Sequence, residues 1–192
     1  VRDSQAMSIR DHWLDRFYYG SATTFSDEFS GLHVLMDDTN QSINEGGALA
    51  LSNMTQIIHQ KAKLGVDVIL LNSEIMTRLS NSYQILGNSN WRLGPDDFGR
   101  SASTFNGIPL IVDDNISMVE TNGDPPTKTG SNTSSIFFIR TGAVEQGLMQ
   151  ALIGEELFRV SAYDLHNKNA IRSRVVAYSA IVAPRYSVSR IR

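Results

Sequence analysis

Apolar side chains recur at helical spacing in three stretches of the chain, which predicts three helices. The first runs from Asp3 to Tyr19 and ends before Gly20, and its apolar face is rich in aromatic residues. The second spans residues 52–64, with Ser52 as its N-cap, and the third spans residues 73–86. A helix with one apolar face must bury that face, so each of the three is expected to lie on an apolar surface.

Short apolar runs and a period of two residues predict the strands. The predicted strands comprise residues 66–71, 108–112, 135–140 and 171–183. The last of them alternates between two sets of side chains over its whole length, as a strand with two different faces does. Asn167 and Asn169 precede it, so we expect a hairpin that pairs it with residues 158–163.

The aromatic face of the first helix needs a broad apolar surface to cover. Trp13 and Phe17 are four residues apart, which places them on the same face of that helix. We expect both to pack on the closing strand, around Val176, Tyr178 or Ala180.

Three segments show neither period and are predicted to be irregular. Residues 21–44 are predicted to form short strands and turns, and residues 88–104 a loop that leads into the strand at residues 108–112. Residues 122–132 contain glycine, proline and polar side chains without an apolar anchor. This composition predicts an exposed loop that is disordered in an isolated subunit.

The strand at residues 108–112 begins with two informative features. Asn106-Gly107 before it predicts a tight turn with positive φ angles. Pro109 lacks the N–H that a ladder bond needs, which predicts a place at the start of the strand or on a sheet edge.

An acidic pair, Asp113 and Asp114, closes this strand and is the most conspicuous candidate for chemistry. With Asp96 or Asp97 it would supply the carboxylates of a metal-dependent hydrolase, for which tight Mg²⁺ or Mn²⁺ binding lost in Asp113→Asn would be the evidence. Neighbouring residues of a strand point to opposite faces, however, and this favours a solvated turn. We therefore predict no catalytic, cofactor-binding or metal-binding residue.

The other candidates for chemistry do not combine into a site. Lys128-Thr129-Gly130 matches a motif of penicillin-binding enzymes, but the sequence has no Ser-x-x-Lys to supply the nucleophile. The histidines lie in different elements without ligand spacing and are expected to be surface or packing residues; they are His12, His33, His59 and His166. The chain has no cysteine, which excludes disulfides and thiolate chemistry.

Length and charge narrow the class of protein further. The 192 residues fit one domain or two small ones, and no apolar run approaches the roughly 20 residues of a membrane helix, so no membrane partner is expected. The net charge is −3, but residues 1–45 hold eight acids against three arginines, whereas six basic residues and no acid follow Asp164. We expect the acidic first segment and the basic last segment to pair, in preference to a nucleic-acid surface on the arginines.

Four stretches of the chain follow one another in a characteristic order. They are Phe29-Ser30-Gly31-Leu32, then Val66-Asp67-Val68-Ile69-Leu70-Leu71-Asn72 within residues 52–87, then Phe105-Asn106-Gly107-Ile108-Pro109-Leu110-Ile111, and finally Val182-Ala183-Pro184-Arg185-Tyr186. This order, which extends over nearly the whole chain, resembles the major capsid proteins of tailed bacteriophages. Their HK97-type coat fold is shared with encapsulin shells.

The resemblance implies an α+β, HK97-like coat protein fold with a long spine helix, a peripheral-domain sheet and an axial α/β domain. Residues 1–45 and 157–192 would form the peripheral domain, with the spine helix at residues 3–19. Residues 46–156 would form the axial domain, and residues 122–132 would lie at its inner tip near the symmetry axis of an assembled shell.

The function that the resemblance implies is structural and not enzymatic. Identical subunits would assemble as pentamers and hexamers into the icosahedral shell of a tailed bacteriophage or prophage, which encloses the genome. The implied partners are scaffold or portal proteins and packaged DNA, bound without sequence specificity. The shell would be assembled in the bacterial cytoplasm and found in the virion. An encapsulin-like compartment around protein cargo is the alternative within the same fold.

One part of the family pattern has no counterpart in the sequence. Coat proteins of this kind carry an N-terminal arm and an extended hairpin loop before the spine helix, whereas this chain begins at Val1 directly in helical sequence. We therefore expect an upstream segment. We also expect the 192 residues alone to form monomers or small oligomers, and shells only when that segment is restored.

Overall fold

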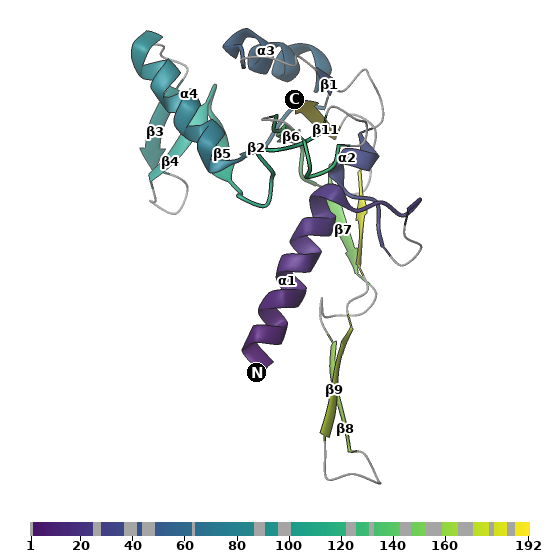
Figure 1. Cartoon of the computed structure of the whole chain (residues 1–192). Helices are drawn as coiled ribbons and strands as arrows, with labels where there is room; N and C mark the ends of the chain where they lie inside the picture. Colours follow the sequence, from purple (N-terminus) through teal and green to yellow (C-terminus); the bar gives the residue numbers. More distant parts are fainter. Residues whose placement is uncertain are drawn as a thin grey trace.

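Seven short strands form the main sheet of the protein, in the order β1-β11-β6-β2-β5-β4-β3 (Figure 1). The structure, a computed structural model, describes residues 2–24, 28–36, 42–43, 49–62, 64–86, 91–95, 101–121, 126–130, 133–142, 147–152, 159–164, 171–176, 179–183 and 187–192. The strands of the main sheet are β1 (Ser42–Ile43), β2 (Val68–Leu71), β3 (Trp91–Pro95), β4 (Ser101–Phe105), β5 (Ile108–Val112), β6 (Ile136–Ile139) and β11 (Val188–Ile191). Strands β2 and β5 are parallel, and β6 is antiparallel to both of its neighbours, β2 and β11.

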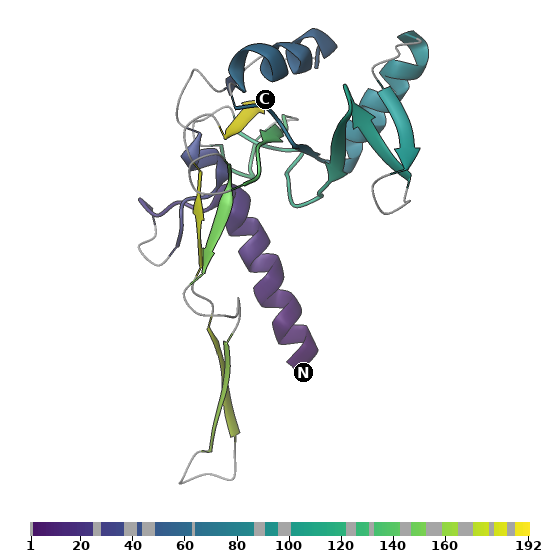
Figure 2. The ribbon, with the colours of Figure 1, turned by 180° about the vertical axis from the view of Figure 1, so that it is seen from behind.

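Helices and two ribbons of paired strands complete the described part of the fold. The helices are α1 (Arg2–Tyr19), α2 (Leu32–Leu35), α3 (Leu51–Gln56), which continues as a π-helical turn over Ile57–Lys61, and α4 (Ser73–Leu86). The ribbons pair β7 (Met149–Leu152) with β10 (Ser179–Val182) and β8 (Arg159–Asp164) with β9 (Ile171–Val176), both antiparallel. Figures 1 and 2 show α1 and the ribbons extending from the same side of the sheet, while α4 lies with β3, β4 and β5 on another side.

Two hydrophobic cores lie on opposite faces of the main sheet. The α4-side core consists of Met54, Ile57, Ile69, Leu71, Leu79, Phe105, Leu110, Ile136, Phe138 and Ile191. The α1-side core consists of Tyr18, Leu32, Met36, Ile116, Phe137, Ile139 and Val188. Strand β6 contributes alternate residues to each core, and all four of its side chains are buried. A strand covered on both faces has an unbroken apolar sequence, which explains the run that predicted β6.

Most of the strongly periodic elements are confirmed. Helix α1 matches the predicted helix at residues 3–19, α4 matches residues 73–86 and β5 matches residues 108–112. Strands β2 and β6 lie within their predicted segments. The second helix begins one residue earlier than predicted and ends at Lys61, and its N-cap is Ala50 and not Ser52.

The turn before β5 is also confirmed. Asn106 and Gly107 have φ angles of 51° and 81°, as a two-residue hairpin requires. Pro109 is the second residue of β5, and the described ladder to β2 begins one residue later, at Leu110. The predicted position was therefore wrong, since Pro109 is not the first residue of its strand and β5 lies between β2 and β4 and not on an edge. The missing N–H is tolerated because the ladder to β2 begins only after Pro109.

Three predictions about irregular and extended segments were wrong. Residues 88–104 contain β3 and β4, whose polar sequence gives no apolar alternation but which pair with each other and, through β4, with β5. Residues 21–44 contain the short helix α2 as well as the strand β1. The predicted closing strand consists of two strands, β9, which pairs with β8, and β10, which pairs with β7. Six residues separate β7 from β8, whereas only two separate β9 from β10. The two pairs therefore cannot form one ladder with a continuous register.

The predicted hairpin and the position of Trp13 are supported. Strand β8 pairs with β9 over residues 159–164 and 171–176, and the predicted turn at Asn167 and Asn169 lies outside the described residues. The indole N–H of Trp13 donates to Ser179 Oγ at 2.7 Å, next to the expected contact at Ala180. The ring also lies 5.5 Å from that of Phe17 and 6.0 Å from that of Phe29.

A contact between two glycines holds the segment after α1 against the end of that helix. The N–H of Gly31 donates to the carbonyl oxygen of Gly20 at 2.9 Å. A Cβ atom on Gly31 would lie 2.6 Å from the carbonyl oxygen of Arg16, which is too close for any real contact. The φ angle of Gly31 is −78°, which any residue adopts, so close packing and not backbone conformation requires glycine here.

Substitution of Gly31 by alanine is expected to lower the free energy of unfolding by about 1–3 kcal/mol, because the added methyl group forces two main-chain segments apart. Urea denaturation measures this loss. The matched control is Gly107→Asn, at a position with φ of 81° and open space around it, where asparagine fits the left-handed conformation. Equal stability of Gly31→Ala and the unmodified protein would show that the segment is not held by this contact.

Candidate functional site

A buried carboxylate, Glu120, lies between α1, α2 and the main sheet. Its side chain is fully buried. Its Oε1 accepts a hydrogen bond from the Tyr19 hydroxyl at 2.6 Å, and its Oε2 accepts one from Ser135 Oγ at 2.6 Å. The ring nitrogen Nε2 of His33 lies 3.2 Å from Oε1. Glu120 thus holds the centre of a polar network in the interior of the protein.

His33 and Arg190 complete this network, and both are buried. The Nη1 of Arg190 lies 2.9 Å from the Nδ1 of His33. A guanidinium group only donates, so Nδ1 must accept, and the proton of the neutral ring is on Nε2, which faces Glu120. Arg190 and Glu120 then carry opposite charges on the two sides of a neutral imidazole.

The surroundings of the network shift the pKa values of Glu120, His33 and Tyr19. Burial would raise the pKa of Glu120, but hydrogen bonds from His33, Ser135 and Tyr19 outweigh it and hold that pKa below its usual value. Burial lowers the pKa of His33, and Arg190 and Arg192 lower it further against the opposing effect of Glu120. Burial and the neighbouring Glu120 raise the pKa of Tyr19. At neutral pH the network therefore contains an ionised carboxylate and a neutral histidine.

Each member of the network comes from a different part of the chain. Tyr19 ends α1, His33 lies in α2, Glu120 follows β5, Ser135 precedes β6 and Arg190 lies in β11. The Tyr19 hydroxyl also accepts a hydrogen bond from the backbone N–H of Ser117, at 2.8 Å. The network therefore joins both helices to the sheet and to the segment that precedes β6.

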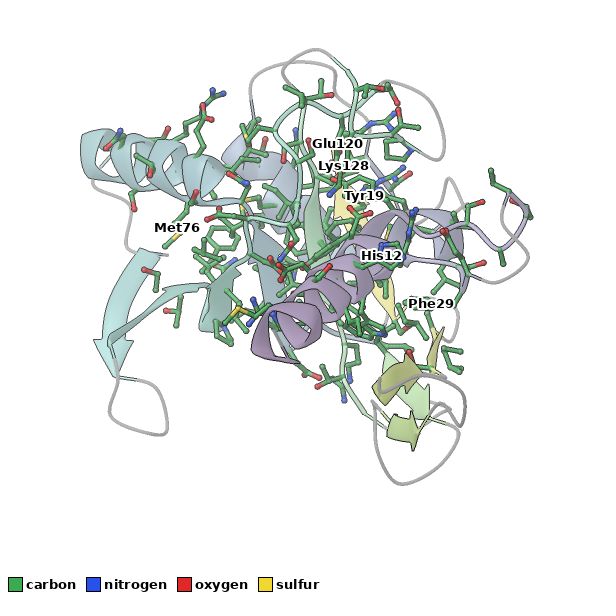
Figure 3. All side chains as sticks on the ribbon, turned by 60° about the horizontal axis from the view of Figure 1, so that its bottom comes forward. His12, Tyr19, Phe29, Met76, Glu120 and Lys128 are labelled. Carbon is green, nitrogen blue, oxygen red and sulfur yellow. The ribbon has the colours of Figure 1, made fainter. Side chains whose placement is uncertain are left out.

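Lys128 covers the outer side of this network. Its ammonium group pairs with the carboxylate of Asp15 and lies 5.0 Å from the centre of the Tyr19 ring (Figure 3). Gly130 packs so closely on the main chain that a Cβ atom there would overlap the carbonyl oxygen of Glu120. Residues 126–130 thus lie against α1, which corrects their expected position at the inner tip of an axial domain. The rest of the predicted loop, at 122–125 and 131–132, lies outside the described residues.

The network contains serine, histidine and glutamate but is not arranged as a hydrolytic triad. In such a triad the serine donates to the histidine, and the acid orients the histidine from its other side. Here Ser135 donates to Glu120, and the second nitrogen of His33 accepts from Arg190. All of these side chains are buried, so a substrate has no access to them. The arrangement is suited to holding parts of the fold together.

The acidic pair after β5 also has structural partners. Asp113 accepts hydrogen bonds from the Tyr18 hydroxyl at 2.6 Å and from the backbone N–H of Asn115 at 2.9 Å. Asp114 accepts from the backbone N–H of Ser73 at the start of α4, and the side chain and backbone N–H of Ser73 together lower the pKa of Asp114. The two carboxylates thus serve different elements, as the prediction of a turn implied. Asp96 and Asp97 lie outside the described residues, among which no group of three or more acidic or histidine side chains could hold a metal ion.

The predictions for the histidines, and for the pairing of the acidic first segment with the basic last segment, are only partly confirmed. His12 and His59 are exposed, as expected of surface residues, His33 belongs to the buried network, and His166 lies outside the described residues. Of the acids in the first segment, Asp11 pairs with Arg10, Asp15 with Lys128 and Arg16, and Glu28 with Arg16. For these three acids the expected pairing with the last segment is wrong. Arg190 instead reaches the first segment through His33.

Replacement of Glu120 by glutamine is expected to lower the free energy of unfolding by about 3–5 kcal/mol, since it removes the negative charge of a buried network and turns an amide donor toward the donating hydroxyls of Tyr19 and Ser135. Chemical denaturation at pH 7 measures the loss. Glu74→Gln is the control, because Glu74 forms an exposed pair with Arg78 and its loss should stay within about 0.5 kcal/mol. Similar denaturation midpoints for the two variants would contradict the importance given to the buried network.

Comparisons with known proteins bear on the fold. The sequence matches no family model and no curated protein. The structure matches the cryo-EM structure of the holo-SrpI encapsulin complex from Synechococcus elongatus PCC 7942, with a TM-score of 0.70 and 18% sequence identity. The match covers 99% of this chain and 64% of that chain, so this chain spans less than two thirds of its neighbour's length. Within the described residues, no helix is long and apolar enough to cross a membrane.

The likeness confirms the predicted fold class at a general level. The chain has a mixed α+β fold like that of an encapsulin shell protein, which is of the HK97 type. The division into peripheral and axial domains stays a prediction, and the main sheet includes strands from both predicted parts. The matched structure is an encapsulin and not a bacteriophage coat protein, so the chain is best described as having an HK97-type, encapsulin-like fold.

Proposed function

We propose that the chain is a self-assembling subunit of a closed protein shell of the encapsulin type. The observation that carries the proposal is the match to an encapsulin over 99% of the chain at a TM-score of 0.70. The match includes the projecting elements as well as the sheet, so it concerns the whole described shape and not a common core motif. This favours the encapsulin-like alternative over the bacteriophage coat protein that the sequence first suggested.

The shape of the subunit supports assembly. The ribbon formed by β8 and β9 pairs only with itself within the described residues and extends away from the main sheet in Figures 1 and 2. An isolated two-stranded ribbon is marginally stable in water, so it gains stability from a covering partner. In a shell, identical neighbouring subunits would provide that cover, with the same contact repeated around each symmetry axis.

Exposed apolar side chains next to the α1-side core also suit a contact between subunits. Across one row of the sheet, Phe137 pairs with Leu70 and Leu70 pairs with Ile111. Phe137 is fully buried, whereas Ile111 is 50% exposed. The cover provided by α1 and α2 therefore ends between these strands, and the apolar face of the sheet continues beyond it.

The proposed partners are identical subunits, grouped as pentamers and hexamers, around protein cargo. Scaffold and portal proteins, packaged DNA and a location in the virion belong to the bacteriophage reading, which the contents of a purified particle would distinguish. The proposal assigns no catalytic step to this chain. A metal titration with Asp113→Asn as the control tests the hydrolase alternative, since tight stoichiometric binding lost in the variant would favour an enzyme.

Electron microscopy of the complete gene product that contains these residues is the direct test of the proposed function. We expect closed particles of uniform diameter, with protein and not nuclease-sensitive DNA as their content. Mass photometry over a range of concentrations gives an independent readout of assembly. A product that remains monomeric at every concentration would overturn the proposal, and DNA-filled particles would restore the bacteriophage reading.

Ile111→Asp is expected to raise the protein concentration at which particles form by at least about tenfold. The same substitution should change the free energy of unfolding by about 1 kcal/mol or less. The residue is half exposed in the subunit, so the substitution costs little in the monomer, but a charge at a desolvated contact is costly. Asn81→Asp introduces the same acid at an exposed position on α4 and serves as the control. Unchanged particle yield for Ile111→Asp would exclude this face of the sheet from the contact.

A further inference from the structure

The buried network lies at the joint between α1, α2 and the main sheet, beside the α1-side core of apolar side chains. Tyr18 donates to Asp113, and its ring packs 5.7 Å from that of Phe137 in β6. The main-chain bond between Gly31 and Gly20 ties the segment before α2 to the end of α1. The two helices are therefore linked to each other directly, and the polar network around Glu120 joins both of them to the sheet.

We propose that this network is an acid-sensitive latch, which holds the end of α1 and α2 on the sheet at neutral pH and releases them as one unit when the pH falls. The α4-side core lies on the opposite face of the sheet and takes no part in the network. Release would therefore leave β2, β5, β6 and α4 folded. The latch is a property of the subunit and does not depend on the proposed shell.

The arrangement of donors and charges explains why a proton disrupts the closed state. Among the described side chains, Tyr19 and Ser135 donate to the Glu120 carboxylate, and the protonated Nε2 of His33 faces it at 3.2 Å. A protonated carboxyl group would therefore meet donors, and the network would lose its negative charge. A second proton on His33 would sit on Nδ1, where it would face the donating guanidinium of Arg190.

Charged and titratable groups from several elements surround the network. Tyr19 faces Glu120 from α1, Arg190 faces His33 from β11, and Arg192 adds positive charge near His33 from the end of the chain. Lys128 and Asp15 neutralise one another on the outer side, above Tyr19. The groups expected to respond are His33, whose ring lies between Arg190 and Glu120, and then Glu120 itself.

The direction of the response follows from the lowered pKa values of both groups in the closed state. When the joint opens, His33 and Glu120 return toward their usual values of 6.5 and 4.5 and take up protons that the closed state excludes. Stability of the joint is thus fully present above pH 6.5. It is lost as the pH falls, first through His33 and then, below 4.5, through Glu120 as well.

Hydrogen exchange followed by NMR from pH 7 to pH 5 tests the proposal on the intact 192-residue chain. Uptake of one proton on opening makes the opening constant rise about tenfold per pH unit below the usual pKa of histidine. After correction for intrinsic exchange, we expect this loss of protection at the amide of Ser117, which donates across the joint to the Tyr19 hydroxyl. The amide of Gly31, whose bond lies within the released unit, and the amides of β2 and β6 should keep their protection. Equal loss at all amides would show a merely structural network, and no loss at Ser117 would overturn the latch.

Two variants separate the latch from general destabilisation. His33→Asn should remove the pH dependence between pH 7 and pH 5 at Ser117, since the titrating group is absent. Glu74→Gln, which removes an exposed carboxylate of α4, should leave the full pH dependence in place. If His33→Asn does not fold, the pH series on the unmodified chain still decides the question. A pH dependence that persists in a folded His33→Asn protein would contradict the assignment.

Discussion

The charge of Glu120 must be compensated inside the protein, and this requirement fixes the relation between α1, α2 and the sheet. A carboxylate removed from water costs several kcal/mol, on the order of the whole stability of a small domain, unless charges and hydrogen bonds replace the lost solvent. The compensation here comes from Tyr19, His33, Ser135 and, through the imidazole, Arg190. Because hydrogen bonds depend on direction, the helices can satisfy the network in only one orientation.

Close main-chain packing at glycine residues, where no side chain would fit, also holds this joint. Gly31 and Gly20 bring two main-chain segments into hydrogen-bonding contact, and Gly130 does the same beside Glu120. Apolar packing alone would tolerate small rotations of α1, since hydrophobic contacts have little directional preference. Polar bonds and main-chain contacts remove that freedom. In a shell subunit, the angle between α1 and the sheet would set how neighbouring copies meet, which gives a reason for this rigidity.

Local patterns in the sequence predicted those elements that have a clear apolar period or a characteristic turn sequence. Helix α4, strand β5 and the Asn106-Gly107 turn were all placed correctly, because burial and turn geometry act within a few residues. Strands β3 and β4 were missed, because pairing to β5 and not apolar alternation makes them strands. Glu120 gave no signal either. Its hydrogen-bond partners lie 101 residues before it, at Tyr19, and 15 residues after it, at Ser135, and only the folded chain brings them together.

The fold of the subunit does not by itself explain why the joint contains charged side chains. The likeness to an encapsulin at 18% identity shows that the arrangement of elements can be reached with very different side chains, so the fold alone does not require a titratable centre. An apolar joint of the same shape would be as stable, since buried ion pairs seldom add net stability. A charged joint differs in one respect: protons act on it. If the subunits assemble as proposed, the same joint recurs in each of them, so the release of α1 and α2 on protonation would be repeated at every contact of the shell.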